Sequence, residues 1–152
     1  MTVIEKINLK ELYEVHDNLW LEETVKLLKQ NRFNELDLEN LIEELEDLGR
    51  ERKLAMASLL QQVVIHLLLL DYWDTEYQRN ARHWQDEIDS FRYQLNDRLT
   101  TNLTRYLEEN LAKTYQRALK RVNNKTGNNL NLPQQCPYTL EQLLDEDWFP
   151  HQ

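Results

Sequence analysis

The chain has 152 residues, of which two are glycine and three are proline, and its formal net charge is −9 at pH 7. β-Sandwiches and barrels need a turn every 8–12 residues, and Rossmann and Walker phosphate loops need several glycines together. This composition excludes those classes of fold. The length is that of one ordinary domain. We therefore expect a single domain over residues 1–152, with a lead-in over residues 1–16 and a docking segment over residues 133–152.

Apolar residues recur at a spacing near 3.6 along the chain, which indicates helices. Asn8 and Glu11 have the spacing of a capping box, and so do Thr139 and Gln142. The pattern predicts helices over residues 18–30, 37–49, 52–73, 77–99 and 102–122, with a short helix after Thr139. We expect the second of these to begin at Asp37 and to end or bend at Gly49.

Residues 63–70, VVIHLLLL, are the most apolar stretch. A helix that is apolar on all sides belongs at the centre of a bundle. The sequence thus predicts an all-α bundle of five or six helices, with residues 52–73 at its centre and residues 77–99 antiparallel to them. This stretch of eight residues, interrupted by His66, is too short to span a bilayer. Because the N-terminus also lacks signal-peptide features and Cys136 is the single cysteine, we expect a soluble cytoplasmic protein.

Charge is distributed unevenly along the chain. Residues 1–50 hold 13 acidic and six basic side chains, whereas residues 77–130 hold ten basic and six acidic ones. A local excess of basic residues favours contact with phosphate even when the whole chain is acidic. The candidate nucleic-acid contacts are Arg79, Arg82, Lys113, Arg117, Lys120 and Arg121. The alternative is a solvated face, or pairing of these cations with acidic residues of the same chain.

A stripe of carboxylates suggests a possible metal site. Glu39, Glu43 and Glu46 lie within about 60° of one another on a helix. Asp71 and Asp74, spaced i, i+3, could add oxygen ligands for Mg²⁺ or Mn²⁺ from a second helix. This arrangement looks like that of the all-α MazG-type nucleotide pyrophosphatases. The alternative is an ordinary acidic helix face exposed to solvent.

His66 is the one polar residue within the most apolar stretch. It is a candidate general base or metal ligand. The alternative is a buried neutral imidazole with a hydrogen bond. Cys136, ahead of a predicted helix N-terminus, is a weaker candidate for a nucleophile because no neighbouring residue supplies a base.

Four runs resemble one protein family: LDLENLIEELEDLG (residues 36–49), IHLLLL (65–70), RNARHW (79–84) and CPYTLEQLLDEDWFP (136–150). The family is the domain of unknown function DUF29, found largely in cyanobacteria. The resemblance implies an all-helical domain and a cyanobacterial source, without an established activity. From the residues we predict an interaction module that binds a protein partner or nucleic acid through charge-separated helical faces. The alternative is a metal-dependent phosphohydrolase or nuclease that uses the carboxylate stripe.

Overall fold

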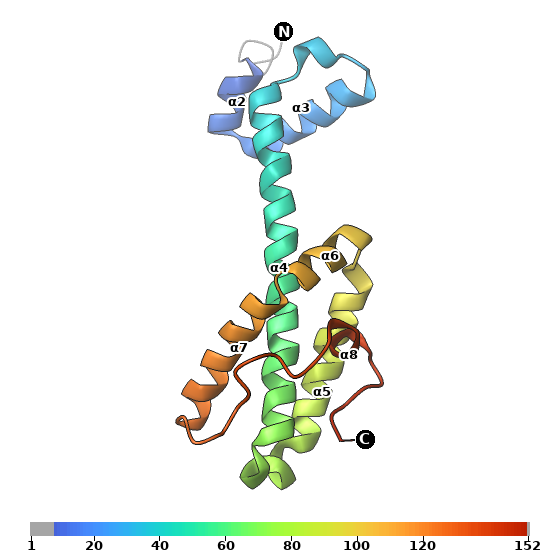
Figure 1. The fold of residues 1–152 in the computed structure, drawn as a ribbon. Coiled ribbons are helices and arrows are strands. Elements are labelled where there is room, and N and C mark those ends of the chain that lie inside the picture. Colours follow the sequence, from blue (N-terminus) through green and yellow to red (C-terminus); the bar gives the residue numbers. More distant parts are fainter. Residues whose placement is uncertain (1–7, 152) are drawn as a thin grey trace. The chain divides into compact units, whose positions relative to one another are not determined.

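The computed structural model describes residues 8–151, and the chain divides into two compact units, unit 1 over residues 1–51 and unit 2 over residues 52–152. The described residues form seven α-helices and one 3-10 helix, with no strand (Figure 1). This confirms the all-α prediction. The expectation that the chain behaves as a single domain stays a prediction.

Unit 1 contains α2 (Leu9–Val15), α3 (Asp17–Lys29), the 3-10 helix η1 (Phe33–Glu35) and the first part of α4 (Leu38–Tyr72). Asn8 caps α2, because its side chain accepts a hydrogen bond from the Glu11 amide at 2.8 Å. The predicted lead-in therefore contains a helix of its own, while its first seven residues lie outside the described part of the chain.

Helix α4 is one uninterrupted helix of 35 residues. It begins after Asp37, whose carboxylate accepts from the backbone amide of Asn40 at 3.5 Å. The predicted end at Gly49 is wrong, because α4 continues through that residue to Tyr72. The alternative of a bend at Gly49 stays a prediction. A single glycine inside a helix costs only about 1 kcal/mol relative to alanine, so glycine alone does not stop a helix.

Unit 2 contains the rest of α4, followed by α5 (Asp74–Arg98), α6 (Thr101–Glu109), α7 (Leu111–Thr126) and α8 (Leu140–Leu144). The helix predicted over residues 102–122 is broken at Asn110, which separates α6 from α7. The Asn110 side chain donates to the Tyr106 carbonyl at 2.8 Å. Asparagine competes in this way with backbone hydrogen bonds and so favours helix ends.

The core of unit 2 forms around the second part of α4. Its buried side chains run from Met56 to Leu70, and helices α5 and α7 flank it (Figure 1). Two ring contacts show that α5 runs antiparallel to α4: Trp73 stacks on Trp84 with centroids 6.0 Å apart, and His66 lies 5.5 Å from Phe91. Both the central helix and its antiparallel neighbour were predicted.

By length and composition alone, α4 is also the one described helix that could cross a bilayer, and half of its most apolar window is buried inside the protein. This is weak evidence for a membrane span, since the core helix of a soluble protein passes the same test.

The chain after α7 returns across α4 to reach α5 (Figure 1). Gly127 ends α7 in the left-handed conformation, with φ of 68°. The hydroxyl of Tyr115 on α7 donates a hydrogen bond to the Pro133 carbonyl and so holds the returning segment. The predicted capping box of Thr139 and Gln142 is present at the start of α8.

Candidate interaction surfaces

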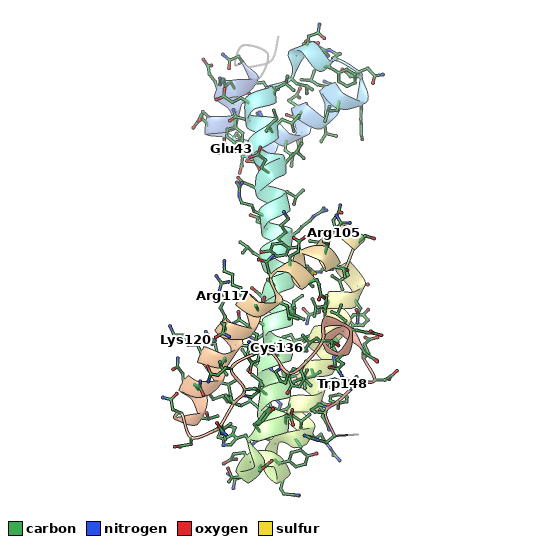
Figure 2. The ribbon with its side chains drawn as sticks, viewed as in Figure 1. Glu43, Arg105, Arg117, Lys120, Cys136 and Trp148 are labelled. Atoms are coloured by element: carbon green, nitrogen blue, oxygen red, sulfur yellow. The ribbon has the colours of Figure 1, made fainter. Side chains whose placement is uncertain are left out.

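Helix α7 has one buried face and one exposed face. Its buried side chains, among them Tyr115, Ala118 and Val122, belong to or border the core of unit 2. This spacing leaves the opposite side of the helix to solvent. Figure 2 shows Arg117 and Lys120 on the side of α7 away from α4. The helix is therefore fixed by its apolar face, with its polar face free to contact another molecule.

The exposed face of α7 carries charge of one sign. All five basic side chains of the helix are exposed: Lys113, Arg117, Lys120, Arg121 and Lys125. None of them takes part in an ion pair within the described residues of unit 2. The sequence holds no Asp or Glu from residue 110 to residue 140. Within the described residues, no carboxylate therefore lies within 4.0 Å of these five cations.

The surface of α5 is different. Arg79 and Arg82 are exposed on this helix, but Glu76 and Asp86 lie on the same side of it at one-turn spacing. Neither arginine has a carboxylate within 4.0 Å in the described range. Neighbouring acids lower the potential that phosphate would meet here, so α5 is a weaker candidate than α7.

Arg92, a third basic residue of α5, is fully buried. Its guanidinium donates to the carbonyls of Leu143 at 2.9 Å, Gln142 at 3.0 Å and Trp148 at 2.7 Å, and it lies 5.1 Å from the Phe149 ring centroid. Burial lowers the pKa of Arg92 from its ordinary value. This arginine anchors α8 and is not a phosphate contact.

The sequence contains a signal for the Arg92 anchor. Arg92 follows the buried Ile88 by four residues and precedes the buried Leu95 by three, so it lies on the core-facing side of α5.

The predicted metal ligands are distributed along α4 and the start of α5. Glu39 pairs with Lys10 at 2.7 Å, Glu46 lies 4.0 Å from Arg50, and Glu43 is exposed. In the described part of the chain, no three His, Cys, Asp or Glu side chains gather to hold a metal ion. The metal site therefore gains no support and stays a prediction.

Asp71 holds the C-terminal segment. Its side chain is 9% exposed, accepts from the Tyr138 hydroxyl at 2.9 Å, and lies 2.6 Å from His151 Nε2. Burial and the Asp71 charge both raise the pKa of Tyr138, so this phenol stays a donor. Asp74, the first residue of α5, is exposed.

A hollow of about 320 Å³ lies beside Asp71 and Asp74. Aromatic and C-terminal residues complete its lining, among them Tyr77, Phe149 and His151. Because both oxygens of Asp71 already have partners, the inner carboxylate of this hollow is engaged in holding the chain.

His66 is partly buried, and its Nδ1 donates to the Gln62 carbonyl at 2.7 Å. Burial lowers the pKa of this imidazole. Cys136 is partly buried on the segment that crosses α4 (Figure 2), and burial raises the pKa of its thiol. A raised pKa disfavours the thiolate that a nucleophile needs. A structural role is therefore enough to explain the contacts of His66 and Cys136.

These features define an all-α protein with a closed helical core and a strongly cationic helix on its surface. The chain belongs to the family described as domain of unknown function DUF29, whose model matches residues 12–149. No curated protein and no solved structure matches the chain. The family predicted from four sequence runs is confirmed, while a cyanobacterial source stays a prediction.

Proposed function

We propose that this protein is an interaction module that binds the phosphate backbone of a nucleic acid through the exposed face of α7. The observation that carries this proposal is the row of five exposed cations without an acidic neighbour in the sequence from residue 110 to residue 140. We place this activity in the cytoplasm.

The composition of the α7 face suits phosphate. Arg117 and Arg121 can each donate two parallel hydrogen bonds to phosphate oxygens, which lysine cannot do. Asn124, also exposed on this helix, adds a neutral donor. From Lys113 to Lys125 the cations extend over about 18 Å at 1.5 Å per residue, a length that spans several phosphates of a strand.

Fluorescence anisotropy with a labelled 20-base-pair duplex and a labelled single strand of the same length, at low salt, tests the proposal. We expect the double variant Arg117→Gln with Lys120→Gln to bind at least tenfold more weakly than the wild type, since it removes two phosphate contacts. The matched control is Lys26→Gln with Lys29→Gln, two exposed cations of α3, which should leave binding unchanged.

Polyglutamate serves as the competitor that separates nucleic acid from an acidic protein partner. If polyglutamate displaces the oligonucleotides at equal charge concentration, the α7 face recognises acidic chains in general and the proposal is wrong. Equal losses in the α7 and α3 variants would also contradict it.

A further inference from the structure

The first part of α4 directs its polar face toward its own unit. Three side chains of α2 and α3 donate hydrogen bonds to carboxylates at the start of α4. These bonds are Lys10 to Glu39 at 2.7 Å, Tyr13 to Glu44 at 2.6 Å and Trp20 to Asp37 at 3.2 Å. Asn40 is also buried, with its amide 2.7 Å from Asp37. The hydrogen bonds that α2 and α3 make with this part of the chain therefore end on carboxylates.

The apolar face of the same part of α4 is exposed. Leu38, Ile42, Leu45 and Leu48 are between 44% and 60% exposed. At 100° per residue these four side chains lie within an arc of about 120°, so they form one stripe, which we call the α4 stripe. A helix normally buries such a face and exposes its carboxylates. In unit 1 this apolar face is exposed, and the glutamates of the helix are exposed as well.

Unit 1 has few other apolar contacts with which to cover this stripe. Among its described residues only three hydrophobic side chains are buried: Leu12, Trp20 and Leu27. Single exposed leucines are ordinary on protein surfaces, but a continuous apolar row marks an interaction site. Leu38, Leu41, Leu45 and Leu48 follow one another at steps of three, four and three residues, which is the spacing of a helix-to-helix seam. Leu41, within the same arc, is half-buried.

Carboxylates border the α4 stripe and determine which partner fits it. Glu39, Glu43 and Glu46 lie along one edge, next to Ile42, and Glu44 lies along the other (Figure 2 labels Glu43). Residues 8–51 hold 13 acidic and five basic side chains. A second copy of this chain would bring like charges together, which costs several kcal/mol in an interface. A partner with basic side chains on both sides of its apolar row would instead be attracted to these carboxylates.

We propose that the α4 stripe binds an amphipathic helix of a partner protein, with leucine or isoleucine at three- and four-residue spacing and lysine or arginine on both sides of that row. The partner's apolar side chains pack against Ile42 and Leu45, while its cations pair with the bordering glutamates. This gives Glu39, Glu43 and Glu46 a role as the rim of a protein interface. The surface lies in unit 1, so its test does not depend on oligonucleotide binding by α7.

A three-heptad synthetic peptide with leucines on one face and lysines beside them is the probe, labelled for anisotropy. The control peptide carries glutamate in place of each lysine. We expect the full chain to bind the basic peptide at least tenfold more tightly than the acidic one. The variant Ile42→Asp with Leu45→Asp should lose at least tenfold in affinity, whereas Val15→Asp, an exposed apolar residue on α2, should bind normally.

A second variant, Glu43→Lys with Glu46→Lys, keeps the apolar row intact. It should bind the basic peptide more weakly, and the acidic peptide more tightly, than the wild type does. Four outcomes would overturn the proposal. The first is that the wild type does not bind the basic peptide, and the second is that the Asp variant keeps its helix content and binds the peptide as tightly as the wild type. The third is that the Lys variant prefers the same peptide as the wild type. The fourth is that the wild type forms a dimer and the Asp variant does not. The last would make a second copy the occupant.

Discussion

Among the described residues, unit 2 buries 21 hydrophobic side chains and exposes three large ones, whereas unit 1 buries three and exposes nine. Unit 2 covers the second part of α4 with helices of its own chain. In unit 1, side chains of α2 donate hydrogen bonds to glutamates of the first part of α4, and the α4 stripe stays exposed. The comparison teaches that an apolar row on one helix can serve as core in one segment and as a binding surface in another.

The largest effect is expected from Arg92, because it supports the closed core of unit 2. Arg92→Leu leaves three carbonyls near α8 without their donor, and each unsatisfied buried group costs about 1–3 kcal/mol. We expect the free energy of unfolding, measured with urea, to fall by about 4 kcal/mol or more. Arg82→Leu, an exposed arginine of the same helix, is the control and should change it little.

The contrast between the two units can be tested with two leucines of α4. Leu67 is fully buried and Leu45 is 60% exposed. Leu67→Ala should cost about 3 kcal/mol, within the range for core leucines, while Leu45→Ala should change stability by less than about 0.5 kcal/mol. A cost for Leu45→Ala as large as that for Leu67→Ala would show that the chain covers the α4 stripe itself.

The two glycines should respond in opposite directions. Gly49 lies inside α4, and an added Cβ there would meet nothing within 4 Å. Gly49→Ala should therefore raise the free energy of unfolding by about 0.5–1 kcal/mol. Gly127 has a φ of 68°, so Gly127→Ala should lower it by about 1 kcal/mol. Thermal unfolding of the two variants measures both changes in stability.

The smallest effect concerns pH. Burial lowers the pKa of His66 below its ordinary value of 6.5, so the unfolded chain takes up this proton at a higher pH than the folded chain. Stability from this residue is present above pH 6.5 and is lost as the pH falls through the folded pKa. His66→Phe should flatten that part of the stability profile. An unchanged slope would show that the imidazole is not the group responsible.

Much of the fold could be predicted from apolar spacing. The central helix, its antiparallel neighbour and the capping box at Thr139 are all confirmed. The errors arose at helix boundaries, where the preference of a single residue is weak compared with the influence of the helix around it. One glycine did not stop α4 at Gly49, and one asparagine did break the helix at Asn110, because its side chain competes for a backbone carbonyl.

The surfaces were harder to predict than the helices. Four of the five cations of α7 were predicted, because they recur on one face at helical spacing; Lys125, the fifth, was missed because the predicted helix stopped at residue 122. The role of Asp71 was not, because its partners Tyr138 and His151 come from the far end of the chain. The exposed α4 stripe was also missed: its pattern is that of a core helix, and no sequence signal shows whether its own chain covers it.

The dependence of oligonucleotide affinity on salt tests the proposed function most directly. Each phosphate contact adds about −0.9 to the slope of the logarithm of the association constant against the logarithm of the salt concentration for duplex DNA. Four or five contacts from α7 predict a slope of about −4, and Arg117→Gln with Lys120→Gln should reduce it to about −2. A slope near zero, or the same slope for wild type and variant, would contradict binding through α7.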